Sequence, residues 1–367
     1  MHMADALVSP AVGGVMWAAS MGLAAYSARK VAADLPDRKV PLMGVLGAFV
    51  FAAQMINFTI PGTGSSGHLG GGMILAILLG PHAAFLVMFS ILAVQALLFA
   101  DGGLLALGCN VFNLGFWPCF VVYPLLFRAM VGRSPSQGRL LAGSTVSGIL
   151  ALQLGAFGVV LQTVMSGISD LPFGTFVLLM QPIHLAIGVV EGLVTATLVA
   201  FVWKARPEVL EFAAEGGSGG GRSLKPVLIG LAAAAVVTGG ALSWFASAHP
   251  DGLEWSMFQT SGKEELEPPN GVHTSLADVQ KKTALLPDYG FAESEEPRPA
   301  EGTGPAEGTD AAVSLSATEK EPGQEAGETW PAVSAGTTVS GLVGGGAVLL
   351  VAGLLGITLR LARRRAA

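Results

Sequence analysis

Charged side chains are scarce in this chain. Asp, Glu, Lys and Arg make up 13% of its 367 residues, whereas a soluble domain carries about 25%. Hydrophobic residues account for 51%, and the mean hydropathy is +0.60. This balance excludes an ordinary soluble domain and predicts an integral membrane protein in contact with lipid.

Cysteines and catalytic signatures are scarce as well. Cys109 and Cys119 are the only cysteines. They are too few for a disulfide scaffold, and we expect them to be small buried side chains. The sequence has no G-x-x-x-x-G-K-[ST] phosphate loop, no nucleophile elbow, no H-E-x-x-H and no C-x-x-C cluster. We therefore expect no ATP hydrolysis of that kind, no enzymatic catalysis and no nucleic-acid partner.

Two further signals are missing. No positively charged start and A-x-A site mark a cleavable signal peptide, so we expect the first helix to insert uncleaved. No internal repeat is visible, so the inverted-repeat transporter architecture gains no support.

Long apolar runs are what the sequence does contain. A run of about 20 apolar residues spans the hydrocarbon core of a membrane as a helix, so we predict an all-α polytopic membrane protein. The tract 69–100 is broken at Gly80-Pro81-His82 and is either a bent pair of helices or a re-entrant element. The other runs fall at 11–29, 41–60, 104–127, 140–165, 173–203, 226–247 and 338–359.

Basic residues predict the orientation. They gather near residues 29–39, 128–139, 204–225 and 360–365. Because Lys and Arg favour the cytoplasmic side, we place these four clusters and the carboxyl terminus inside. The amino terminus, the 61–68 loop, Asp101 and the 248–337 segment are then expected outside.

Composition divides the chain into two modules. Residues 1–205 form one polytopic domain, and residues 206–225 form a cytoplasmic linker with a flexible Gly-rich hinge. Residues 226–367 form a two-helix transmembrane hairpin with an extracytoplasmic loop. Residues 292–329 are rich in Glu, Pro, Gly, Ala and Thr, and we expect this part of the loop to be disordered.

The first two residues, Met1 and His2, make a metal chelate possible. A free α-amine, the His2 amide nitrogen and its imidazole Nδ1 can reach one ion in a plane and leave a fourth corner open. Such a planar nitrogen set suits Ni(II) or Cu(II), and sometimes Co(II), better than tetrahedral zinc. The alternative is a start codon followed by a chance residue.

A glycine-rich loop supplies a candidate for the fourth corner. His68 lies in the loop 61–72 and is expected on the same side of the membrane as His2. The alternative is a flexible loop with an incidental histidine. Asp5, Ser66 and Asn57 are candidates for contacts that support the ligands, and Asp5 could instead cap the first helix.

Polar residues inside the spans are costly and usually have a use. Gln95, Asn110 and Asn113 cluster around Asp101, where they either line a path into the site or form interhelical hydrogen bonds. Gln181, His184 and Glu191 share one helical face. There, His184 is either a second metal ligand or part of a buried histidine–carboxylate packing contact.

Small residues form a stripe on the first helix. Gly14, Ala18 and Gly22 are spaced by four residues, a pattern that permits close helix–helix contact. The stripe serves either packing within this chain or docking of a partner subunit.

Several separated motifs resemble one known family. The Met1-His2 start, the Gly62–Gly72 loop, the Gln95–Asn113 stretch and Glu191-Gly192-Leu193-Val194-Thr195 are similar to the CbiM/NikM family. Those proteins are the substrate-capture (S) components of energy-coupling-factor (ECF) transporters for cobalt and nickel, and cobalt uptake feeds cobalamin biosynthesis. Pro250-Asp251-Gly252-Leu253-Glu254 resembles the PDGLE module of CbiN/NikN, so the chain looks like a fusion of the two.

The resemblance implies a bundle like that of an ECF S component in a bacterial inner membrane. It implies that Ni(II) or Co(II) is the bound substrate, held by the Met1 amine, by His2 and by His68. A transmembrane T subunit and separate cytoplasmic ATPase subunits are implied as partners. Met3 and Ala6 depart from the Ile and Gly that family members often carry here. Two other classes stay open, namely a self-sufficient secondary permease or channel and a metal-sensing membrane protein that does not transport.

Overall fold

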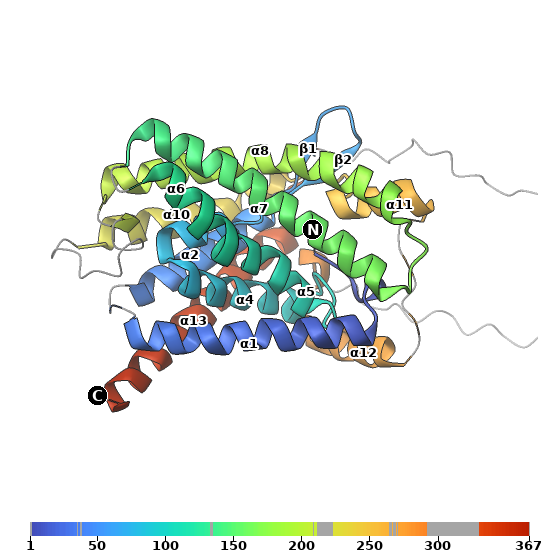
Figure 1. Ribbon diagram of the computed structural model, residues 1–367, viewed down its shortest axis with the longest axis horizontal. Helices are drawn as coiled ribbons and strands as arrows, with labels where there is room; N and C mark the ends of the chain where they lie inside the picture. Colours follow the sequence, from blue (N-terminus) through green and yellow to red (C-terminus); the bar gives the residue numbers. More distant parts are fainter. Residues whose placement is uncertain are drawn as a thin grey trace, which may run out of the picture.

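Helices dominate the computed structural model. It describes residues 2–34, 36, 39–132, 135–207, 209–210, 223–263, 266, 269, 271–291 and 330–366. Within these ranges, six helices are long and apolar enough to cross a membrane. Figure 1 shows the helices arranged as a bundle. The prediction of an all-α polytopic fold is confirmed. The six helices are α1 (Pro10–Asp34), α4 (Pro81–Leu98), the helix Leu107–Val131, α7 (Gln137–Ser166), α8 (Phe173–Ala205) and α13 (Ala335–Ala366).

The helix Leu107–Val131 changes its winding along its length. It begins as α5 (Leu107–Val111), continues as the wide helix η2 (Phe112–Phe127) and ends as α6 (Arg128–Val131). Pro118 and Pro124 lie inside η2. Because proline cannot donate the usual helical hydrogen bond, the wider winding lets the helix continue past both rings.

The tract 69–100 is a bent pair of helices. The short α3 (Gly72–Leu79) runs into Gly80, which has a φ of 82°, and Pro81 then starts α4. A positive φ suits glycine, and a proline suits the first turn of a helix. Lys39 Nζ, at the start of α2 (Lys39–Gln54), donates to the Leu79 carbonyl oxygen at 2.8 Å. The bend therefore lies at the end of the bundle where α2 begins.

Two of the expected spans are shorter than predicted. The 41–60 run ends its helix at Gln54, and residues 58–60 form β1 (Phe58–Ile60), which pairs antiparallel with β2 (Ser65–Gly67). Phe, Thr and Ile favour strands, and a glycine-containing turn closes the hairpin. The 226–247 run forms α10 (Lys225–Gly240) and then the short η3 (Leu242–Phe245). Here Gly239 and Gly240 weaken the helix.

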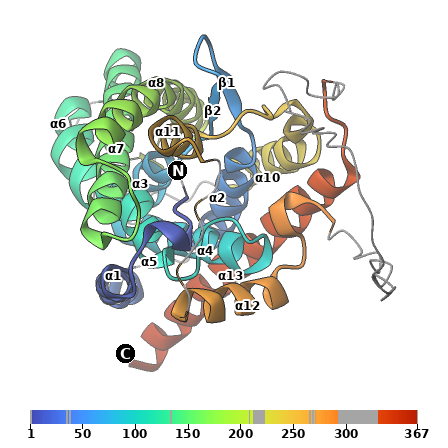
Figure 2. The same cartoon turned by 90° about the vertical axis from the view of Figure 1, so that its right-hand side faces the viewer.

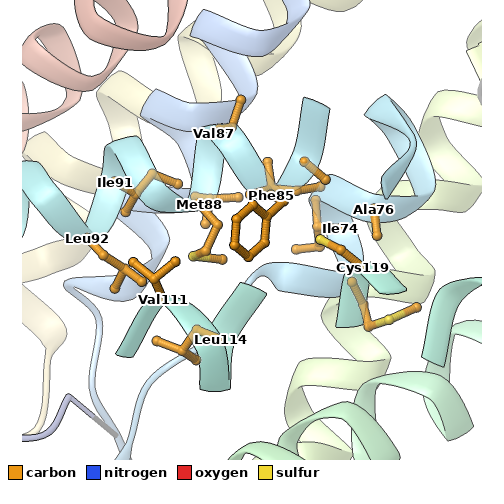
Figure 3. Packing of buried hydrophobic residues seen from close by; sticks show 14 of the residues in the cluster. Ile74, Ala76, Phe85, Val87, Met88, Ile91, Leu92, Val111, Leu114 and Cys119 are labelled. Atoms are coloured by element: carbon orange, nitrogen blue, oxygen red, sulfur yellow. The ribbon is translucent and has the colours of Figure 1, made fainter. Parts of the chain in front are cut away.

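Side chains from three helices fill the centre of the bundle. Phe85 and Met88 of α4 are fully buried against Ile74 of α3 and against Val111 and Leu114 of the following helix, as Figure 3 shows. Cys109 and Cys119 are also buried and are not disulfide-bonded. This core holds the end of α4 and the start of α5, and Asp101 lies in the loop between them.

The carboxyl-terminal hairpin packs on the rest of the bundle. Its helices α10 and α13 lie against α2, and a Cβ on Gly47 of α2 would come 2.9 Å from Val348 Cγ1 of α13. The chain between them forms α11 (Gly252–Ser261), α12 (Val272–Thr283) and η4 (Pro287–Tyr289). Figures 1 and 2 show α11 and α12 at the same end of the bundle as the β1–β2 hairpin. Residues 292–329, for which disorder was expected, lie outside the described residues.

The small-residue stripe of α1 faces away from the described part of the chain. Gly14, Ala18 and Gly22 are exposed, and a Cβ on either glycine would meet no atom within 4 Å. The packed face of α1 carries Ser20 instead, whose hydroxyl donates to the Gly108 carbonyl oxygen at 2.7 Å. Close packing of α1 against the rest of the chain therefore uses the face that carries Ser20 and not the stripe.

Candidate metal centre

Hydrogen bonds hold the amino-terminal segment between helices. The Met3 amide donates to Asn110 Oδ1 at 2.8 Å, and Asn110 Nδ2 donates back to the Met3 carbonyl oxygen at 3.2 Å. The Gly103 amide donates to the same carbonyl oxygen at 3.0 Å. Met3 is completely buried. The backbone next to His2 is thus fixed by α5 and by the loop that precedes it.

Asp5 stabilises this segment from its other side. Its Oδ1 accepts a hydrogen bond from the Ala106 amide at 2.9 Å. Asp5 lies in the short η1 (Asp5–Leu7), before α1 begins at Pro10. Asp5 does not cap α1, and among the described residues its carboxylate accepts no hydrogen bond from His2 or His68, while its support of the ligands through charge stays a prediction. Asp5 anchors the 104–106 loop.

His2 forms a hydrogen-bonded chain with two residues that the sequence had not singled out as ligand supports. Its Nδ1 lies 2.8 Å from Asp101 Oδ1, and the Tyr289 hydroxyl donates to Asp101 Oδ2. Burial favours a neutral Asp101, but the positive charge and hydrogen bond of His2 outweigh burial and keep the pKa of Asp101 well below its usual range. Burial, and next the charge of Asp101, raise the pKa of the Tyr289 phenol, which therefore remains a donor. The His2 side chain is 8% exposed.

His68 stacks on His2. Their ring centroids lie 5.0 Å apart, with an angle of 23° between the planes. His68 Nδ1 lies 3.1 Å from the Leu69 carbonyl oxygen. A carbonyl only accepts, so Nδ1 carries the proton and the lone pair is on Nε2. Burial lowers the pKa of His68 to about 3, so the ring is neutral, as a metal ligand must be.

Glu191 of α8 fixes the glycine-rich backbone after His68. Its carboxylate accepts hydrogen bonds from the Gly70 amide at 2.6 Å and the Gly71 amide at 2.9 Å. Gln54 Nε2 donates to the Gly70 carbonyl oxygen at 2.8 Å. The expected packing contact between Glu191 and His184 is therefore wrong, because the carboxylate binds two loop amides.

The PDGLE segment borders the same loop. The Ser66 amide donates to the Pro250 carbonyl oxygen at 2.8 Å, and the Ser66 hydroxyl donates to the His249 carbonyl oxygen at 2.7 Å. Ser66 thus binds the carboxyl-terminal module and does not support a histidine ring directly. Asp251 caps α11 by accepting from the amides of Leu253 and Glu254, and its Oδ2 lies 3.8 Å from His68 Nε2.

The other predicted polar residues divide between a cavity and the packed interior. His2, Asp5, Asn57 and His68 line a cavity of about 560 Å³, but Gln95, Asn110 and Asn113 do not. Gln95 Nε2 donates to Gln54 Oε1 at 3.0 Å, and Asn113 Nδ2 donates to Gln162 Oε1 at 2.7 Å. Gln95, Asn110 and Asn113 therefore form hydrogen bonds between segments of the bundle, as one of the two expectations had it, and do not line the cavity.

The two candidate histidines therefore lie together at one end of the bundle. Met1, the third member of the predicted set, lies outside the described residues. In the part of the chain that the structure describes, no group of three or more His, Cys, Asp or Glu side chains is placed to hold a metal ion.

Comparison with known proteins identifies the family. The family model described as the cobalt uptake substrate-specific transmembrane region, CbiM, matches residues 2–209. The chain belongs to the CbiM family. A second model, the PDGLE domain, matches residues 225–361. The resemblance predicted from the motifs is confirmed, including the fusion of a CbiM region with a PDGLE domain.

Relatives of this CbiM chain are named for metal transport. The fused nickel transport protein NikMN of Rhodobacter capsulatus is 34% identical, over 57% of this chain and 64% of that protein. The cobalt transport protein CbiM of Sorangium cellulosum is 32% identical, over 47% of this chain and 76% of that protein. A crystal structure of a truncated transition metal transporter matches with a TM-score of 0.50 and 30% identity, over 56% of this chain and 99% of that one. The six apolar helices and these relatives indicate a multi-pass membrane protein.

Replacement of Glu191 tests how the His68 loop is held. In Glu191→Gln, one oxygen remains to accept, and the amide NH2 faces a buried backbone N–H. We expect a loss of unfolding free energy of about 1–3 kcal/mol, the usual cost of an unsatisfied buried donor. Thermal unfolding in detergent measures it, with the exposed Thr197→Ala on the same helix as the control. Equal melting temperatures for wild type and Glu191→Gln would contradict this role.

Proposed function

We propose that this chain captures Ni(II) or Co(II) as the S component of an ECF importer. The donors are the Met1 amine, the His2 amide nitrogen, His2 Nδ1 and His68 Nε2. Nitrogen donors in one plane suit Ni(II) well, and imidazole suits both ions. The ion is the substrate and is released after capture.

The observation that supports this proposal best is the stacking of two buried imidazoles from distant parts of the sequence. His2 and His68 lie with ring centroids 5.0 Å apart, and the Nδ1 proton of His68 leaves its lone pair on Nε2. The Leu69 carbonyl oxygen fixes that tautomer by accepting a hydrogen bond from Nδ1–H, a role that outer groups often have around metal-binding histidines.

Capture by this route requires an exchange at His2. Its Nδ1 lies beside Asp101 in the structure, so the ion has to replace a proton on that nitrogen. The Tyr289 hydroxyl bonds the other Asp101 oxygen and holds the carboxylate near the ring. Asp101 is thus placed to balance the charge of the ion. Because donors must lose protons, binding is coupled to proton release.

The partners are those that the resemblance to ECF S components implies, and the missing phosphate loop agrees with them. Without a phosphate loop, ATP hydrolysis falls to separate cytoplasmic subunits, and a transmembrane T subunit links them to this chain. The exposed stripe at Gly14, Ala18 and Gly22 is the surface we assign to that subunit. The basic clusters favour a cytoplasmic carboxyl terminus and an extracytoplasmic metal centre.

Substitution of His2 tests the chelate. His2→Ala removes the imidazole donor, so we expect Ni(II) and Co(II) affinity to fall by at least about 100-fold, which corresponds to about 2.8 kcal/mol. Isothermal titration of the purified, untagged protein measures this loss. The control is His249→Ala, since His249 is exposed. Equal affinities for His2→Ala and wild type would refute the chelate.

A tag before Met1 tests the amine donor. An added peptide turns the amine into an amide, which is a far poorer donor, so we expect affinity to drop by about 10-fold or more. Titration of the protein before and after proteolytic release of the tag gives the comparison. A carboxyl-terminal tag is the control. If the blocked protein binds as tightly as the released one, Met1 does not contribute its amine.

Uptake tests the dependence on partners. Cells that make this chain with its T and ATPase subunits should accumulate radiolabelled nickel or cobalt. Loss of the ATPase subunits should reduce uptake to the background, because this chain lacks a phosphate loop. Uptake that persists without ATPases would indicate a self-sufficient permease. Binding with no uptake by the full set of subunits would indicate a metal sensor.

A further inference from the structure

Positive backbone φ angles mark one contact between the two halves of the chain. Among the described residues, three that are not glycine have a positive φ, namely Ala100 at 56°, Asp288 at 48° and Tyr289 at 58°. A side chain makes this left-handed conformation costly, so it persists only where the surrounding contacts enforce it, and such residues gather at functional sites. All three lie where η4 of the PDGLE domain meets the loop that carries Asp101.

Contacts from η4 fix the first part of this loop, residues 99–103. The Asp288 amide donates to the Phe99 carbonyl oxygen at 2.9 Å, and the rings of Phe99 and Tyr289 stack with their centroids 4.9 Å apart. These contacts hold the backbone just before Ala100. A change to a negative φ at Ala100 would therefore carry the rest of the loop away from its present position.

Gln280 of α12 fixes both ends of the same turn. Its Nε2 donates to the Ala96 carbonyl oxygen at 2.9 Å and to the Gly102 carbonyl oxygen at 2.7 Å. Both hydrogens of the side-chain amide are thus used, one in the last turn of α4 and one beyond Ala100. A single side chain therefore ties together the two segments that Ala100 connects.

The opposite side of the loop holds the start of the chain. Asp101 Oδ1 lies 2.8 Å from His2 Nδ1, and the Gly103 amide donates to the Met3 carbonyl oxygen at 3.0 Å. The loop is therefore held from one side by the PDGLE domain and holds a candidate metal ligand from its other side.

We propose that Gln280 is a positioning residue for metal capture, acting on His2 through the strained loop 99–103. The inference rests on the proposed function, because it assigns a residue that helps to build that site. The contacts of Gln280 and η4 keep Ala100 in its strained conformation. They thus place Asp101 against His2 before an ion arrives. A site that is ordered in advance binds its ion more tightly than one that has to be ordered on binding.

Removal of the Gln280 amide tests this role. In the untagged full chain, Gln280→Ala should weaken Ni(II) binding by about tenfold, measured by isothermal titration with NiCl2. The control is Gln259→Ala, the same change at an exposed glutamine of α11, which should bind nickel as the wild type does. Unchanged affinity in Gln280→Ala would overturn the assignment.

A second substitution separates positioning from general stability. Glycine adopts a positive φ without the cost that a Cβ adds, so Ala100→Gly lets the loop keep its conformation under a weaker restraint. We expect Ala100→Gly to restore most of the nickel affinity that Gln280→Ala loses. A general loss of stability would not be repaired at Ala100. Equal affinities for Gln280→Ala with and without Ala100→Gly would therefore contradict the role of the strained loop.

Hydrogen exchange on the wild type decides the question even if the variants do not fold. Coupling between two sites is reciprocal, so if the contact with the PDGLE domain favours metal capture, bound metal also strengthens that contact. NiCl2 should slow amide exchange in the peptide 280–290 several-fold, measured by mass spectrometry, although none of its residues is a proposed ligand. Nickel binding with unchanged exchange in this peptide would overturn the inference.

Failure of the proposed function gives a different result. A wild type that binds no nickel, or nickel binding that survives His2→Ala, would overturn the chelate itself and this inference with it. Nickel binding that is lost in His2→Ala but is undiminished in Gln280→Ala would overturn only the role of Gln280.

Discussion

The candidate metal centre depends on how the first residues of the chain are held inside the bundle. Met3 and Asn110 exchange two hydrogen bonds through the Met3 backbone, and Gly103 adds a third. Ordering the backbone of three residues costs about 1–2 kcal/mol each in conformational entropy. Buried hydrogen bonds of this kind offset that cost. Only with this segment fixed can His2 stack on His68, which lies 66 positions later in the sequence.

Much of the fold could be predicted from hydrophobicity, because a membrane helix must be apolar along its whole length. The helices near 11–29, 140–165 and 173–203 are all present. Hydrophobicity alone could not place the end of α2, since Phe58–Ile60 is equally apolar but pairs with Ser65–Gly67 as a strand. Nor could it choose between a bend and a re-entrant loop at Gly80. That choice depends on where α3 and α4 pack.

The two candidate histidines could be named from the sequence, but the residues that hold them in place could not. His2 and His68 carry a local chemical signal, but Asp101, Glu191 and Tyr289 are joined to them only by the tertiary fold. The start of α11, by contrast, does carry a signal in the sequence, which our sequence analysis missed. Asp251 and Glu254 form a capping box, and an Asp followed three residues later by Glu is a recognisable signal for the start of a helix.

The charges of the large cavity explain why the two halves of the chain belong together. Its carboxylates include Asp5 and Asp101 from the CbiM region, and Asp251, Glu254 and Asp288 from the PDGLE domain. A cavity lined by one sign of charge concentrates ions of the opposite sign. Gln280 Nε2 also donates to the Gly102 carbonyl oxygen at 2.7 Å, and Tyr289 to Asp101. The PDGLE domain thus contributes three of these five carboxylates and also holds the carboxylate that contacts His2, so both regions build this cavity.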